Sequence, residues 1–98
     1  MKIIYADTNK YDEEYRLILT TFGTHRDLEK HKIILENGLN LTFYMDDADE
    51  NGNEDNLIFD GEVQYDELNK RWVAVINWDN FRHVSDLSPS ELERLDAS

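Results

Sequence analysis

The spacing with the most direct chemical meaning is a run of oxygen-bearing side chains just after position 46. The run matches the first half of a calcium-binding loop, with oxygens at alternate positions and Gly52 at the sixth. Alternate side chains can converge on one cation while the glycine allows the sharp turn. The candidate metal ligands are Asp47, Asp49, Asn51, Asn53 and Asp55.

The second half of this loop departs from the calcium-binding pattern. Ile58 stands where a bidentate glutamate is needed, and Glu54 stands where an apolar residue is expected. The flanking residues alternate like strands, whereas a calcium loop of this kind lies between helices. We therefore predict a polar loop over 46–56 without tight metal binding. A divalent-cation-binding domain that uses this loop is the alternative function.

The histidines do not indicate catalysis. His25 and His31 lie six residues apart, which is not the helical spacing that places two ligands on one face. His83 has Asp86 nearby, but no nucleophile motif accompanies this pair. We predict that the chain is not an enzyme and has no cofactor.

A second candidate is a surface in which aromatic side chains lie beside acids. Such a surface suits a basic partner, because aromatic residues carry much of the energy of interfaces and arginine stacks on them. The candidate partner-binding residues are Trp72, Trp78, Ile76, Asp60, Glu62 and Tyr44. The alternative is that the tryptophans belong to the core.

The distribution of charge limits the classes of partner. The net charge is −12, and the segment from Ile33 to Asn69 has eleven carboxylates and no lysine or arginine. Such a field disfavours nucleic acids and anionic membranes, which are bound through basic surfaces. We expect a small acidic binding or adaptor module whose partner presents a basic protein surface. A subunit of a larger assembly or an inhibitor of a basic enzyme would both fit.

Length and composition predict one domain over residues 1–98. Cysteine is absent, so no disulfide framework is expected. The apolar runs of the chain, such as Val73–Ile76, are far shorter than the ~20 residues of a membrane helix. The start of the chain does not resemble a signal peptide. We therefore expect a cytoplasmic protein.

Strands and turns must position these side chains. Tyr15–Phe22 is predicted to be a strand that ends at Gly23, followed by a short helix with Thr24 as its N-cap. The helix either ends near Lys30 or continues to Glu36. We favour a strand over 32–36 and a hairpin turn at Asn37-Gly38, because the segment after that turn alternates clearly between apolar and polar residues.

A second hairpin sets the register of the aromatic strand. Residues 57–65 alternate, and Asp66–Lys70 is predicted to form a tight turn that pairs its two end residues. Val63 would then face Val73, and Gln64 would face Trp72. This register places Trp72, Ile76 and Trp78 on the same face as Asp60 and Glu62.

The C-terminal segment carries the most specific local signal. Ser88-Pro89-Ser90-Glu91 forms a capping box, with Leu87 and Leu92 at the two staple positions. We predict a short helix that packs over the Trp72–Trp78 face through Leu92 and Leu95. The predicted fold is mainly β: a small antiparallel curled sheet or barrel, Src-homology-3-like or OB-like, with a short internal helical turn and a short C-terminal helix.

Overall fold

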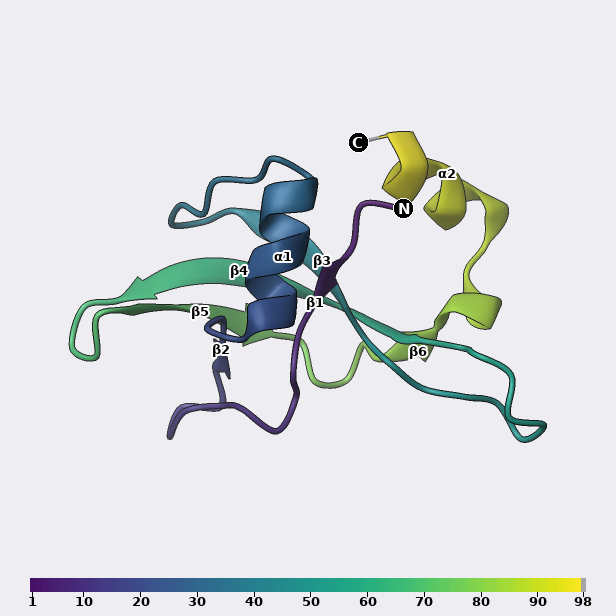
Figure 1. Cartoon of the computed structure of the whole chain (residues 1–98), viewed down its shortest axis with the longest axis horizontal. Helices are drawn as coiled ribbons and strands as arrows, with labels where there is room; N and C mark the ends of the chain where they lie inside the picture. Colours follow the sequence, from purple (N-terminus) through teal and green to yellow (C-terminus); the bar gives the residue numbers. More distant parts are fainter. Residues whose placement is uncertain (98) are drawn as a thin grey trace.

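One long strand, β4 (Leu57–Asp66), organises the fold (Figure 1). It pairs with β3 (Asn40–Met45) along one edge, and with β5 (Arg71–Ile76) and then β6 (Arg82–His83) along the other. The computed structural model describes residues 1–97, without the side chain of Ala97. The remaining elements are β1 (Ile4–Tyr5), β2 (Leu17–Ile18), α1 (Phe22–Lys30), the 3-10 turn η1 (Val84–Asp86) and α2 (Pro89–Ala97).

The sheet is curled but open. Its strand order is β1-β3-β4-β5-β2, with β6 beside β4. All pairs are antiparallel except β1 with β3, which is parallel. Because the two end strands do not pair within residues 1–97, the sheet is a half-barrel rather than a closed barrel. The expected mainly β fold, a small curled sheet with short helices, is confirmed.

The alternation expected in β3 is present. Leu39, Leu41, Phe43 and Met45 all contact the main core, and the polar loop 46–56 connects β3 to β4 as predicted. In β4 the register continues through Gly61 without an inserted residue. A Cβ at this glycine would lie 2.5 Å from Ile76 Cδ1 and 3.1 Å from the Val75 carbonyl oxygen, so a side chain here would displace its neighbours.

The predicted register of the β4–β5 hairpin is wrong by one residue. Asp66 pairs with Arg71, not Lys70, so the turn has four residues instead of three. Lys70 adopts the left-handed conformation (φ +52°), while the amide and side chain of Asn69 both donate to the Asp66 carboxylate. Since side chains alternate along a strand, the shift turns each side chain of β5 to the opposite face.

The main core therefore lies on the Trp72–Ile76 face of β5. Val63 faces Ala74, and Gln64 faces Val73. The helix that covers this face is α1, which contributes Leu28 (Figure 1). The buried members of the main core are Ile4, Ala6, Leu17, Leu19, Leu28, Phe43, Phe59, Val63, Ala74 and Ile76.

α2 forms a second, smaller cluster. The helix starts as predicted, with Pro89 in its first turn and the Ser88 hydroxyl accepting the Glu91 N–H at 3.2 Å. However, Leu87 and Leu95 pack against Ile58, with Leu92 partly buried beside them. The expectation that α2 covers the Trp72–Trp78 face is wrong, because the register shift had already turned that face toward α1. Across residues 1–97, neither helix has the length and apolar character to cross a bilayer.

α1 begins earlier than predicted and completes the edge of the sheet. Its N-cap is Thr21, and the strand expected before it shrinks to β2. Thr24, the expected cap, is buried and donates its hydroxyl to the Tyr5 carbonyl at 2.6 Å. The Asp27 carboxylate accepts the Tyr5 N–H at 2.9 Å. Two helix side chains thus satisfy the backbone of β1, which ends the sheet on that side.

The Asn37-Gly38 turn is present, but residues 32–36 do not form the predicted strand. The turn packs on β4 instead. Gly38 N–H donates to the Val63 carbonyl at 2.8 Å, and the Asn37 side-chain oxygen accepts the Tyr65 N–H at 2.7 Å. This turn therefore directs the chain from α1 onto β4, and no hairpin precedes β3.

Candidate partner-binding surface

The register shift separates the predicted partner-binding residues. Trp72 and Ile76 face the main core, whereas Asp60 and Glu62 project from the opposite face of the sheet, because they pair with Thr42 and Val75. The surface of aromatic residues beside acids that we expected on β5 is therefore not assembled there.

The other predicted contacts have partners within the chain. Tyr44 is half-buried, and its hydroxyl accepts a hydrogen bond from Arg26 at 3.3 Å. Burial and the nearby Asp27 raise the pKa of the Tyr44 phenol. Asp60 accepts the Thr42 hydroxyl at 2.8 Å and lies 3.3 Å from the Arg82 guanidinium, so much of its charge is compensated.

Trp78 differs from Trp72 and Ile76, because its side chain remains 40% exposed. It lies in the connection over 77–81, between two strands that both pair with β4. Because the chain leaves the sheet after β5 and rejoins it at β6, the Trp78 indole lies at the surface. The indole N–H donates to the Tyr15 carbonyl at 3.1 Å, so the ring is held in a fixed orientation.

Trp78 belongs to a continuous stack of rings that begins in the core. Trp78 stacks on Phe81 with a centroid distance of 5.7 Å and an interplanar angle of 11°. Phe81 stacks on Phe59 at 4.4 Å, and Phe59 stacks on Phe43 at 5.9 Å. Since Phe43 and Phe59 are fully buried, the exposed indole rests on a rigid aromatic base.

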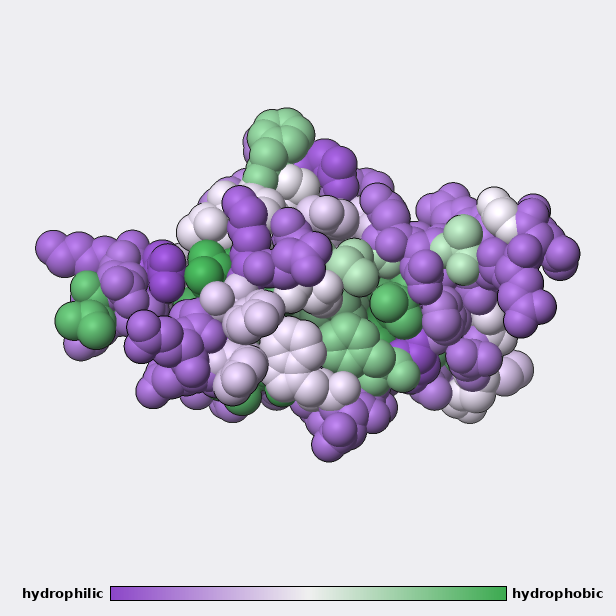
Figure 2. Space-filling model, turned by 90° about the horizontal axis from the view of Figure 1, so that it is seen from below, coloured by the Kyte–Doolittle hydropathy of each residue, from purple (hydrophilic) through white to green (hydrophobic). Residues whose placement is uncertain are grey.

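Two tyrosines extend this stack into solvent. Tyr11 contacts Trp78 edge to face at 6.2 Å and stacks with Tyr15 at 5.7 Å. Their exposed fractions are 49% for Tyr11 and 66% for Tyr15. We call Tyr11, Tyr15 and Trp78 the aromatic patch. Figure 2, which views the molecule from below, shows pale and green residues at the centre of this face with purple, hydrophilic residues around them.

The loop that carries both tyrosines is fixed by Asp12. One carboxylate oxygen of Asp12 accepts the N–H groups of Glu14 and Arg16, each at 2.9 Å, and the other accepts Arg16 Nε at 2.8 Å. Burial opposes ionisation of Asp12, but the hydrogen bonds from Arg16 outweigh it and lower the pKa of this carboxyl group. These contacts hold Tyr15 at φ +59°, an unfavourable conformation for a tyrosine.

Acidic residues accompany the aromatic patch. Glu13 and Glu14 are exposed between the two tyrosines, and Asp79 is exposed next to Trp78. Arg16 compensates part of this charge, at 3.0 Å from Glu14. The two tyrosines were not among the predicted site residues, because Tyr15 was expected to belong to a strand. The sequence did offer one signal: both tyrosines lie in a strongly charged segment in which apolar and polar residues do not alternate.

Three of the five predicted metal ligands, Asp47, Asp49 and Asp55, use their side-chain oxygens in separate contacts. Asp49 accepts the N–H groups of Asn51 and Asn53 at 2.9 Å. Asp47 accepts a hydrogen bond from His83 at 2.7 Å, and the Asp55 carboxylate binds the Ser85 hydroxyl at 2.6 Å. No group of three or more His, Cys, Asp or Glu side chains placed to hold a metal exists among residues 1–97.

Weak or absent calcium binding by this loop stays a prediction. Calorimetric titration with calcium tests it, and a micromolar dissociation constant would restore the alternative function. The contacts of Asp47 and Asp55 instead attach the loop to β6 and η1. The hydrogen bond to Asp47 raises the pKa of His83 above its usual 6.5, because the nearby carboxylates favour the charged imidazolium.

No family model, curated protein or solved structure matches this chain. Function must therefore be inferred from the surface itself.

Proposed function

We propose that this chain is a non-enzymatic binding module that recognises a basic protein surface through the aromatic patch. The observation that carries the proposal is the stack of rings from Phe43 to Trp78. At its outer end the three rings of the aromatic patch are exposed to solvent and are not covered by other residues to the extent that core rings are. The cytoplasmic location and the lack of nucleic-acid binding expected from the sequence belong to the same proposal.

Rigid exposed rings are costly to leave in water and effective in an interface. The indole loses little conformational entropy on binding, because Phe81 and the Tyr15 carbonyl already fix it. Aromatic residues of this kind supply the largest single contributions to protein–protein affinity. Their exposed faces are also the surfaces on which guanidinium groups stack.

Charge determines the kind of partner. A net charge of −12 attracts cationic surfaces over distances longer than a direct contact and raises their association rate. Exposed Glu13 and Asp79 beside the patch add a local preference for cations. Arginine-bearing segments combine both requirements, since they are cationic and stack on aromatic rings.

The test compares two peptides that differ in charge alone. A short peptide of alternating arginine and glycine is titrated into the protein by calorimetry, and the same peptide with citrulline in place of arginine serves as the neutral control. We expect the arginine peptide to bind more tightly, and its affinity to fall as sodium chloride increases. Equal binding of both peptides, or none by the arginine peptide, refutes the proposal.

Matched variants locate the contact. Trp78→Ala is expected to weaken binding of the arginine peptide about ten-fold, the effect of removing a central aromatic contact. Phe22→Ala is the control, because Phe22 is 82% exposed but lies on α1 beside Arg26 and Tyr44. Equal losses in both variants would show that the patch is not the site. Thermal unfolding of each variant confirms that it is folded.

A further inference from the structure

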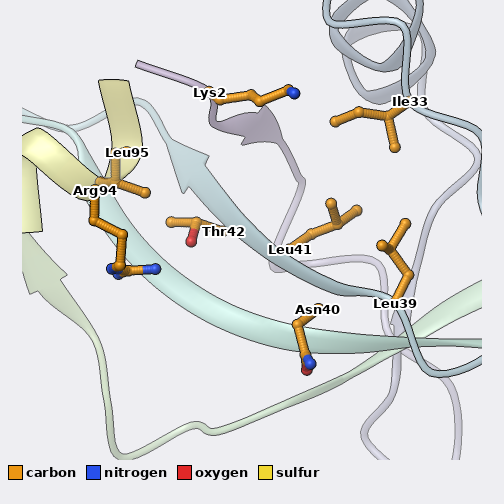
Figure 3. Close-up of a pocket in the computed structure, with 8 residues that line it drawn as sticks. All are labelled: Lys2, Ile33, Leu39, Asn40, Leu41, Thr42, Arg94 and Leu95. Carbon is orange, nitrogen blue, oxygen red and sulfur yellow. The ribbon is translucent and has the colours of Figure 1, made fainter. Parts of the chain in front are cut away.

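A pocket at the end of β3 differs from the rest of this acidic surface. It has a volume of about 310 Å³ and lies where β3 extends past β1, which pairs with Phe43 and Tyr44 alone. Figure 3 shows Lys2 and Arg94 on opposite sides of the strand, with Thr42 between them and Leu41 farther along β3.

Among residues 1–97, the lining of this pocket contains two cations, Lys2 and Arg94, and no carboxylate. This composition is unusual in a chain with 22 acidic and 10 basic residues. Four other surface pockets each have at least one Asp or Glu in their lining. The β3-edge pocket is therefore a local exception to the field that repels anions from the rest of the molecule.

Lys2 is the second observation that indicates an anionic ligand. The other lysines, at 10, 30, 32 and 70, are exposed, whereas Lys2 is half-buried. No carboxylate of residues 1–97 lies within ion-pair distance of its ammonium group. In Figure 3 the ammonium extends toward Ile33, over apolar side chains. A partly desolvated cation gains free energy when an anion joins it.

The other lining residues indicate what the anion is attached to. Ile33, Leu39 and Leu41 contribute apolar side chains that pack against the main core, so these walls are fixed in position. A small site of this kind, apolar with a few charged groups, is typical of a pocket for a small organic molecule. A ligand with one anionic head and an aliphatic body matches both parts of the lining.

We propose that the β3-edge pocket binds a small aliphatic monocarboxylate. A monoanion is favoured over a dianion such as a phosphate monoester, because the single ammonium group of Lys2 can compensate one negative charge and the second would remain exposed to the field of a chain with a net charge of −12. The carboxylate lies at Lys2 and the aliphatic body lies along Leu39 and Leu41. This site is separate from the aromatic patch and does not depend on its function.

The test uses octanoate, with octanol and octylammonium as probes of the same length and different charge. Binding is followed by backbone amide chemical shifts in the full-length protein. We expect octanoate to shift the amides of residues 39–42 and to bind more tightly than the other two probes. Octyl phosphate should bind more weakly than octanoate. Tighter binding of octyl phosphate, or octylammonium binding as tightly as octanoate, overturns the proposal.

A charge-matched pair of variants tests the role of Lys2. Lys2→Gln is expected to weaken octanoate binding about ten-fold, the effect of losing a charged hydrogen bond. Lys10→Gln makes the same change in net charge at an exposed position outside the pocket lining. Equal affinities of the two variants, or shifts confined to residues outside the pocket, would mean that this pocket is not an anion site. Thermal unfolding of both variants confirms that each is folded.

Discussion

Replacing Asp27 with alanine tests whether α1 holds the edge of the sheet. The Asp27 side chain is 7% exposed, and its carboxylate accepts the Tyr5 N–H at 2.9 Å. Alanine removes this charged hydrogen bond and leaves a backbone N–H without a partner, which together cost about 3 kcal/mol. For a domain of this size we expect the midpoint of thermal unfolding to fall by roughly 10–20 °C.

Two further variants separate the hydrogen bond from other effects. Asp27→Asn keeps an acceptor for Tyr5 N–H and loses the ion pair with the half-exposed Arg26, so we expect a loss of about 1 kcal/mol. Glu29→Ala, on the exposed side of the same helix, controls for changes in helix propensity. Circular dichroism measures all three. If Asp27→Ala loses no more stability than Glu29→Ala, the proposed role of Asp27 is refuted.

The same carboxylate predicts a dependence on pH. Burial opposes ionisation, but hydrogen bonds from Arg26 and from Tyr5 N–H outweigh it and lower the pKa of Asp27 below its usual 3.8. A group whose pKa is lower in the folded state stabilises the fold above its unfolded pKa and loses that contribution as pH falls through the folded value. The stability difference between wild type and Asp27→Asn should therefore shrink as pH falls from about 5 toward 2.

Three further predictions concern charge and packing. Added sodium chloride should raise the midpoint of thermal unfolding, because screening over ~8–10 Å relieves the repulsion among the eleven carboxylates of residues 33–69. A midpoint that falls as salt increases would show that ion pairs outweigh this repulsion. Leu95→Ala should cost about 2–3 kcal/mol in chemical denaturation without changing tryptophan emission, since α2 does not cover either indole. A red shift in the folded variant would contradict this arrangement. Asp47→Asn should lower the pKa of His83 in an NMR titration, whereas an unchanged pKa would exclude their hydrogen bond in solution.

Local patterns predicted the elements of this fold better than their pairing. The alternation in 39–45 and 57–65 defined β3 and β4, and the capping box at Ser88 located the start of α2. These signals depend on residues close in sequence. They gave the correct fold class because a mainly β chain with short helices has few ways to bury its apolar faces.

The candidate site was mispredicted through a single residue in one turn. Asn69 is the better residue for a left-handed conformation, but its side chain is used to close the turn on Asp66, and Lys70 takes that conformation instead. Nothing in the local sequence distinguishes these outcomes. Because strands have a period of two, the shift placed Trp72 in the core and Asp60 on the far face.

Tertiary contacts also overruled the local signals around α1. Thr24 looked like an N-cap, but its hydroxyl binds the Tyr5 carbonyl, and Thr21 caps the helix. Gly23, read as the end of a strand, lies inside the helix, where a Cβ would approach the Tyr5 ring at 2.6 Å. Such a contact between residues far apart in sequence cannot be inferred before the packing is known.

The two ends of the described chain lie together. The amino group of Met1 is 3.0 Å from the Asp96 carboxylate, and Lys2 N–H donates to the Leu95 carbonyl at 3.0 Å. In Figure 1 this end of the molecule is opposite the 7–16 and 77–81 segments that carry the aromatic patch. A tether attached to Met1 would therefore present the patch outward.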